Sequence, residues 1–319
     1  MALFEMPLEE LRTYRGRNPR PDDFDAYWQA ALAEAQALDP HPMLEPVGFD
    51  GVVADCGDLW FTGVGGARVH ARLWQPRDVR GTHPALLRFH GYGGRAPDWT
   101  EMLAWAARGY TVAALDCRGQ GGSSEDTGVV RGNTRAGHIV RGLDDDPDKL
   151  LFRQIFLDTV VLARLVMARE DVDPARVGAT GASQGGGLTL ACAALVPELK
   201  LAAPIYPFLS DYQRVWEMDL AKSAYEELQT YFRLFDPRHE RESEVFTRLG
   251  YIDVHHLAPR IRAGTMLVTG LADQVCPPST QFAAYNAICG EKRQVLYPDF
   301  GHENLPDVDD LVWTFMGGL

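Results

Sequence analysis

The sequence predicts an α/β fold, in which helices flank a central, mostly parallel sheet of about eight strands. Two observations predict it: a series of short apolar runs that each end in Gly, Asp or Pro, and helical patterns between those runs. Buried strands that alternate with helices are typical of a parallel sheet covered on both faces. Because α/β folds of 319 residues often form one unit, we expect a single domain over residues 1–319.

The expected elements follow one another in a regular order. A helix over about 24–38 has apolar side chains at helical spacing and belongs to an N-terminal helical extension of about 1–40. Two segments with strand character, 59–62 and 69–75, give the sheet an antiparallel start. Further strands are expected at 85–89, 110–115, 177–180, 201–206, 265–269 and 294–297, with helices at 99–107, 150–169, 184–195 and 279–288.

Two stretches interrupt this alternation. Residues 123–149 are rich in Gly, Asp and Arg and are expected to form a long irregular excursion. Residues 211–259 contain several helix-like pieces and form a helical insertion before the strand at 265–269. Long connections of this kind are usually functional, so we expect both to shape a substrate entrance or a subunit contact.

Composition excludes several classes of function. A net charge of -13 argues against nucleic acid, which needs clustered Lys and Arg. We see no basic leader followed by a long apolar run and no segment of bilayer length, so we expect a cytoplasmic protein without membrane contact. The five cysteines are widely spread, without Cys-x-x-Cys spacing, and predict neither disulfides nor a metal site. We expect no cofactor.

The strongest motif is Gly181-Ala-Ser183-Gln-Gly185, which follows an apolar run and precedes a helical pattern. A sharp turn from a strand into a helix forces strained backbone angles on the serine, and glycines on both sides avoid steric clashes. The hydroxyl then projects above the sheet, close to a helix N-terminus. The motif therefore predicts an α/β-hydrolase fold with Ser183 as the nucleophile of a serine esterase. The alternative is a Gly-rich turn that only packs a helix on the sheet.

A serine hydroxyl needs a base to remove its proton, and in this fold an acid and then a histidine follow the serine along the chain. His302 suits the base, because it comes directly after the last strand-like run and before a final helical segment. His255 and His256 lie inside the insertion and His239 in a charged loop, so none of them follows a strand. The alternative for His302 is a capping or surface histidine.

Asp273 suits the acid that orients the histidine. It stands at the C-terminal end of the apolar run beginning at Met266. Asp211 also follows a strand-like run and is its rival. We favour Asp273, because the loop after the penultimate strand faces the loop that carries His302.

Acyl transfer also needs hydrogen-bond donors for the oxyanion. The backbone N–H after the nucleophile, that of Gln184, is the first candidate. The second is expected in the Gly-rich loop 89–94 at the end of an earlier strand, and we predict the backbone N–H of Tyr92.

Arg118-Gly-Gln120-Gly is a further motif, directly after the expected strand at 110–115. An arginine there either orients acidic neighbours such as Glu303 or forms a solvated turn. Chemistry alone does not decide between the two.

Arg118-Gly-Gln120, Gly181-Ala-Ser183-Gln-Gly185 and His302-Glu303, in this order and spacing, resemble the acetyl xylan esterase and cephalosporin C deacetylase family, carbohydrate esterase family 7. The resemblance covers nearly the whole chain, including the opening segments 6–11 and 19–24. Residues 137–142 keep only part of the family's pattern, and residues 150–153 lack its usual tyrosines.

The resemblance implies removal of acetyl groups from acetylated xylo-oligosaccharides and from cephalosporin C. It implies a catalytic triad of Ser183, Asp273 and His302, an oxyanion hole of the Tyr92 and Gln184 amides, and supporting roles for Arg118, Gln120 and Glu303. It also implies a cytoplasmic, metal-free homohexamer. The alternatives are a carboxylesterase or peptidase of other specificity on the same fold, or a catalytically silent binding protein.

Overall fold

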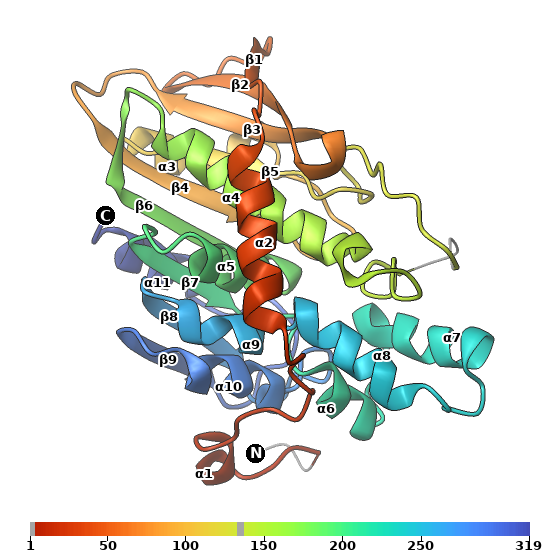
Figure 1. The fold of residues 1–319 in the computed structure, drawn as a ribbon. Coiled ribbons are helices and arrows are strands. Elements are labelled where there is room, and N and C mark those ends of the chain that lie inside the picture. Colours follow the sequence, from red (N-terminus) through yellow and green to blue (C-terminus); the bar gives the residue numbers. More distant parts are fainter. Residues whose placement is uncertain (1–3, 133–136) are drawn as a thin grey trace.

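The computed structural model of the protein describes residues 4–132 and 137–319. Residues 1–3 of the expected N-terminal extension and residues 133–136 of the 123–149 stretch lie outside the described residues. Over the described residues, nine strands form one sheet in the order β1-β2-β3-β5-β4-β6-β7-β8-β9 (Figure 1). The β1–β2, β2–β3 and β3–β5 pairs are antiparallel. The remaining pairs, from β5–β4 to β8–β9 in the order above, are parallel. The predicted mostly parallel sheet with an antiparallel start is therefore confirmed.

The strands coincide with the predicted apolar runs, with one addition. β1 was not predicted, because its four residues are all exposed and give no apolar signal. The strands are β1 (Met43–Pro46), β2 (Ala54–Thr62), β3 (Arg68–Pro76), β4 (His83–Phe89), β5 (Thr111–Leu115), β6 (Val172–Ala182), β7 (Leu201–Ile205), β8 (Gly264–Gly270) and β9 (Lys292–Tyr297).

Helices cover both faces of this sheet (Figure 1). They are α2 (Phe24–Ala37), α3 (Leu103–Ala107), α4 (Leu151–Met167), α5 (Gln184–Leu195), α10 (Pro278–Ala287) and α11 (Val308–Met316), with a short α1 (Leu8–Leu11) and 3-10 turns at 64–66, 99–102 and 147–149. Successive residues of a strand point to opposite faces. Accordingly Leu87 of β4 joins the core beneath α2, α4 and α5, and Leu86 joins the core beneath α3 and α11.

The predicted insertion forms a helical subregion between β7 and β8. It contains α6 (Tyr212–Glu217), α7 (Glu226–Phe235), α8 (Glu242–Leu249) and α9 (Val254–Leu257), with 3-10 turns at 223–225, 250–252 and 258–260. The described part of 123–149 is irregular until its last turn, as its Gly and Asp content predicts. No helix in the described ranges combines the length and the apolarity that a membrane crossing requires.

Candidate active site

Ser183 lies in a strained turn between β6 and α5. Its backbone angles are φ 58° and ψ -119°, a region that side-chain-bearing residues rarely adopt. A Cβ atom on Gly181 would lie 2.6 Å from the Phe89 carbonyl oxygen, and one on Gly185 only 2.1 Å from the same atom. A side chain at either position would therefore clash with the backbone of β4, so both positions require glycine. The predicted reason for the Gly-x-Ser-x-Gly pattern is confirmed.

His302 and Asp273 approach Ser183 from two loops that follow β9 and β8. The His302 Nε2 atom lies 2.9 Å from the Ser183 Oγ atom, and His302 Nδ1 lies 2.8 Å from Asp273 Oδ2. The histidine side chain is 19% exposed, whereas the Asp273 side chain is fully buried. The structure thus brings the three predicted residues into one hydrogen-bonded chain, with the serine at its open end.

Backbone amides hold the Asp273 carboxylate in place. Its Oδ1 atom accepts hydrogen bonds from the amides of Val275 and Cys276, both at 2.8 Å. The Gln281 side chain donates to Oδ2 at 3.3 Å. Because these donors fix the carboxylate, Oδ2 presents its lone pair to His302 in one orientation.

Cys276 is a neighbour of this chain that sequence reasoning missed. Its thiol is buried, and ligand-type atoms of Asp273, Cys276 and His302 all lie within 4.8 Å of one another. Burial raises the pKa of the Cys276 thiol well above its ordinary value, and Asp273 raises it further. A neutral thiol therefore borders the nucleophile. No sequence signal distinguished this cysteine from the others.

The two amides predicted for the oxyanion site lie at the start of α5 and in the loop after β4. Gln184 is the first residue of α5, so its N–H has no carbonyl partner within the helix. Tyr92 lies in the loop after β4, which runs beside the Ser183 turn. His90 anchors that loop, because its Nε2 atom accepts from the Cys117 amide at 3.0 Å while Nδ1 contacts the Gly91 carbonyl at 2.7 Å.

Gln120 contacts the backbone of Gly93, next to Tyr92, and the side chain of Gln184. Its Oε1 atom accepts from the Gly93 amide at 2.9 Å, and its side-chain amide pairs with that of Gln184 at 2.9 Å and 3.0 Å. The loop after β5 therefore ties the loop after β4 to the start of α5. A supporting role for Gln120 agrees with this geometry.

Comparisons with known proteins assign the family. The family model described as acetyl xylan esterase (AXE1) matches residues 1–318. The chain belongs to the acetyl xylan esterase family. The crystal structure of acetyl xylan esterase 1 from Thermoanaerobacterium sp. JW/SL YS485 is 57% identical, with a TM-score of 0.96 over 98% of both chains. The acetyl xylan esterase from Paenibacillus sp. R4 is 35% identical, with a TM-score of 0.93 over 98% of this chain and 99% of that one.

A curated relative extends the comparison. The acetyl esterase Axe7A of Xylanibacter ruminicola is 26% identical over 286 residues, which cover 87% of this chain. The chain spans 62% of the length of that relative. Membership of the acetyl xylan esterase family and the α/β-hydrolase type of fold agree with the resemblance seen in the motifs.

Arg118 orients an acidic side chain, as one interpretation of its motif predicted, but that side chain is Asp158 and not Glu303. It neither contacts Glu303 nor forms a solvated turn. The side chain is 3% exposed and pairs with Asp158 of α4 through two hydrogen bonds of 2.6 Å, with a third bond of 2.9 Å to the Val64 carbonyl. A buried carboxylate on α4 needs a cation, and the loop after β5 is close enough to supply it. Glu303 is exposed and instead accepts from the Gly301 amide at 2.9 Å.

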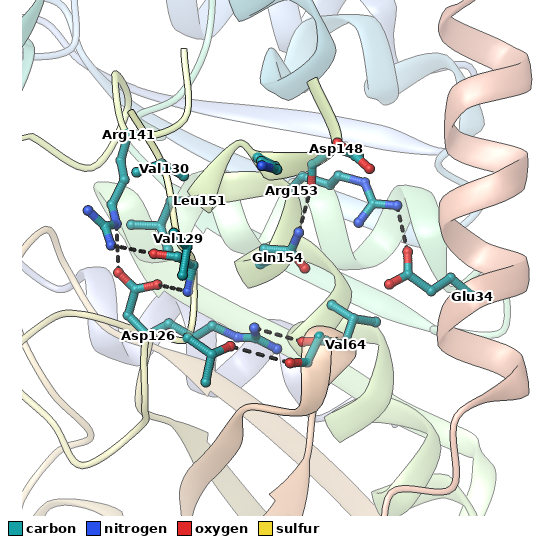
Figure 2. A pocket seen from close by; sticks show the side chains of 15 residues that line it. Glu34, Val64, Asp126, Val129, Val130, Arg141, Asp148, Leu151, Arg153 and Gln154 are labelled. Carbon is teal, nitrogen blue, oxygen red and sulfur yellow. Dashed lines mark hydrogen bonds and ion pairs between the residues drawn. The ribbon is translucent and has the colours of Figure 1, made fainter. Parts of the chain in front are cut away.

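Arg118 also borders a cavity on the α2 and α4 side of the molecule (Figure 2). Ion pairs line this cavity. Asp126 pairs with Arg141 at 2.6 Å, and Glu34 of α2 pairs with Arg153 at 2.7 Å. None of the three residues of the Ser183 chain lines it. We assign it no part in the site.

The rival residues have other partners. Asp211 accepts hydrogen bonds from the Tyr14 hydroxyl at 2.7 Å and from the Arg17 and Asn18 amides at 2.9 Å and 2.8 Å. It therefore binds the N-terminal segment to the insertion. His255 contacts Asp253 at 2.7 Å inside that insertion.

Glu227 of α7 is a second residue that sequence reasoning missed. Its carboxylate accepts from the Tyr92 hydroxyl, and its Oε2 atom from the Val140 amide at 2.9 Å. Burial raises the pKa of Glu227 to about 7, although these hydrogen bonds oppose the shift. The insertion and the 123–149 excursion therefore meet at the side chain of Tyr92. The local pattern of α7 shows only an acidic first turn, which does not predict this contact.

Proposed function

We propose that the protein is a serine esterase that removes acetyl groups from small acetylated carbohydrates, with Ser183, His302 and Asp273 as its catalytic triad. The hydrogen-bonded chain from Ser183 Oγ to His302 Nε2 at 2.9 Å, and from His302 Nδ1 to Asp273 at 2.8 Å, carries this proposal. This order of nucleophile, base and carboxylate activates a serine for acyl transfer. Membership of the acetyl xylan esterase family supports acetyl as the acyl group.

In the proposed mechanism, His302 takes the proton of Ser183 as Oγ attacks the acetyl carbonyl. The imidazolium that forms is stabilised by Asp273, which holds the ring in one tautomer. His302 then gives the proton to the departing sugar oxygen, which leaves an acetyl-enzyme. Water, deprotonated by His302, attacks this ester, and Ser183 recovers its proton as acetate leaves.

The negative charge on the carbonyl oxygen needs donors that are already in place. We assign this role to the amides of Gln184 and Tyr92. The Gln184 amide belongs to the N-terminus of α5, whose dipole favours negative charge. Gln120 supports both donors, because it binds the loop of one and the side chain of the other.

The finer assignments rest on the family resemblance. We propose acetylated xylo-oligosaccharides as substrates and cephalosporin C as a second one. We also propose a cytoplasmic homohexamer without a cofactor or a metal ion. The length of the chain supports one domain over residues 1–319, with its insertion at about 211–259. Light scattering coupled to size-exclusion chromatography tests the hexamer directly.

Kinetics of the Ser183→Ala variant test the chemistry. The variant should lose at least about a thousandfold in kcat with 4-nitrophenyl acetate, because triad members act as a unit. Ser210→Ala is the matched control, since this buried serine donates to the Thr280 carbonyl outside the site. A series of 4-nitrophenyl esters of increasing acyl length should show activity that falls beyond acetyl. Retained activity in Ser183→Ala, or a preference for long acyl chains, contradicts the proposal.

A further inference from the structure

A second cavity lies between α3 and α11 on the sheet face opposite α4 and α5. We call it the α3–α11 cleft. Its floor is formed by Leu86 and Arg88 of β4 and Thr180 of β6, and its walls by the two helices. Its volume is about 380 Å³, within the usual range of small-molecule sites. None of the triad residues lines it.

Arg88 at the floor is a partly buried cation without a partner. Over residues 4–132 and 137–319, no carboxylate oxygen lies within 4.0 Å of its guanidinium nitrogens. Burial lowers the pKa of Arg88, and the more distant carboxylates of Asp309 and Glu101 oppose this shift. Buried arginines are normally paired, as Arg118 is in this protein. The donors of Arg88 therefore face the cleft with hydrogen-bonding capacity to spare.

The walls combine indole rings with carboxylates. Trp105 of α3 and Trp313 of α11 both line the cleft, with ring centroids 4.6 Å apart. Exposed Glu101, Asp309 and Asp310 stand at its rim. The cleft thus offers apolar aromatic surface, strong acceptors and one strong donor group within a single cavity.

The cleft lies close to the proposed catalytic base. Arg88 pairs with Thr180 in the sheet register, three residues before Ser183. Tyr206, after β7, joins the two places. Its ring lies 4.7 Å from that of His302, and both Arg88 and Asp273 act electrostatically on its hydroxyl. Tyr206 therefore lies near both the floor of the cleft and the proposed catalytic base.

We propose that the α3–α11 cleft is a saccharide-binding subsite, which holds a sugar unit of the substrate beyond the acetylated one. The inference rests on the proposed function, because it extends that substrate. Sugar hydroxyls both donate and accept, so they match the carboxylates of Asp309 and Asp310 as well as the guanidinium of Arg88. Trp105 and Trp313 pack against each other, and the Arg108 guanidinium lies 4.5 Å from the Trp313 ring centroid. The indole surface left in the cleft matches the apolar face of a pyranose ring.

Charge selects a neutral ligand over an ionic one. An anion that reached Arg88 would pass the carboxylates of Glu101, Asp309 and Asp310, which repel it. A cation drawn by those carboxylates would meet the unpaired Arg88 at the floor. A neutral molecule with several hydroxyl groups is repelled by neither charge, and it can form hydrogen bonds with both the carboxylates and the guanidinium.

Titration of xylotriose into the full-length protein, followed by calorimetry and by saturation-transfer NMR, tests the subsite. Xylotriose has no acetyl group, so binding is measured without turnover. We expect Trp313→Ala, Arg88→Met and the double variant Asp309→Ala/Asp310→Ala each to weaken binding about tenfold, since hydrogen bonds to charged groups and aromatic contacts are lost. Asp78→Ala, an exposed carboxylate outside the cleft, is the matched control and should bind as the wild type does.

The double variant keeps the test independent of folding, because both aspartates are exposed. Unchanged affinity in this variant, with an unchanged melting temperature, overturns the inference, and so does a wild-type protein that binds no xylotriose at millimolar concentrations. Hydrolysis of 4-nitrophenyl acetate by wild type and Ser183→Ala is measured separately. If hydrolysis depends on Ser183 but xylotriose does not bind, the subsite alone is wrong. If hydrolysis does not depend on Ser183, the proposed function is wrong whatever xylotriose does.

Discussion

Buried charged side chains connect the proposed active site to the rest of the protein. Glu227 holds the Tyr92 hydroxyl and the Val140 amide, and Arg118, in the loop that also carries Gln120, holds Asp158 of α4. Unpaired buried charges are costly, so each of these side chains stabilises the native structure only while its partners are in place.

Glu227 should make stability depend on pH. Its pKa is about 7 in the folded protein, against an ordinary value of 4.5. A carboxyl group with a raised pKa binds its proton more tightly in the folded state, so its contribution to stability is present at low pH and is lost as the pH rises through about 7. Between about pH 5.5 and pH 8.5 the wild type should lose about 2 kcal/mol in free energy of unfolding through this group.

Urea unfolding of Glu227→Gln and of the wild type at both pH values measures this loss. The difference in free energy of unfolding between the two proteins should change by about 2 kcal/mol between the two pH values. Glu226→Gln, the exposed neighbour in the same helical turn, should follow the wild type at both pH values. A pH-independent difference for Glu227→Gln would show that the carboxyl group does not titrate in this range.

Loss of Arg118 should be strongly destabilising. Arg118→Met leaves the Asp158 carboxylate buried without its cation, which costs about 3–5 kcal/mol in free energy of unfolding. The double variant Arg118→Met/Asp158→Leu removes both charges and should recover most of this loss. Arg95→Met, which breaks an ion pair with Asp98 between side chains that are 59% and 66% exposed, is the control and should change stability by less than about 1 kcal/mol. Chemical denaturation decides among these outcomes. A double variant no more stable than Arg118→Met would contradict the account.

Local pattern made some of these residues predictable and not others. Ser183 lies between two glycines, and His302 and Asp273 each follow a strand-like run, so short segments identify all three. The partner of Arg118 lies 40 residues away on a helix whose other side chains are mostly apolar. Only the packing of α4 against the loop after β5 brings the two together, and no short segment contains that information.

At the scale of elements, the strand–turn–helix unit around Ser183 sets the geometry of the site. Gly181 and Gly185 are needed there because the backbone of β4 lies too close for any side chain. The buried strands were predictable because parallel strands covered on both faces are continuously apolar. β1 was not, because it pairs at the sheet edge with all four residues exposed.

Gly185→Ala should disrupt this unit. The added methyl group would meet the Phe89 carbonyl oxygen at 2.1 Å, and backbone on both sides prevents relief. We expect a loss of about 3 kcal/mol or more in free energy of unfolding, together with loss of esterase activity. Gly48→Ala has no atom within 4 Å of the new methyl group and should leave stability and activity close to those of the wild type. Thermal melting and hydrolysis of 4-nitrophenyl acetate measure both, and a stable, active Gly185→Ala would disprove the steric argument.

At the scale of the whole molecule, the two cores on either side of the sheet determine which cysteine thiols a dissolved reagent can reach. Four cysteines are buried and Cys289 is exposed. Burial raises the pKa of the buried thiols, to about 12 for Cys192, and only the thiolate reacts with alkylating agents. Iodoacetamide at about pH 8 should therefore modify Cys289 in the native protein and all five cysteines in urea, as read by peptide mass spectrometry. Rapid native alkylation of Cys276 would mean that the wall beside Ser183 opens to solvent.

The overall architecture was predictable because it depends on the order of apolar runs, whereas the α3–α11 cleft was not. Its residues come from β4, α3, β6 and α11, which are far apart in the chain. Only the folded sheet brings them to one place beside Tyr206 and His302.

Covalent labelling with a fluorophosphonate tests the central claim most directly, because such a reagent reacts with a serine only when a base and an oxyanion site activate it. Peptide mapping should find one label per chain, on Ser183, with activity lost in proportion to labelling, and Ser183→Ala should remain unlabelled. Inactivation without modification of Ser183, or equal labelling of the Ser183→Ala variant, would contradict the account.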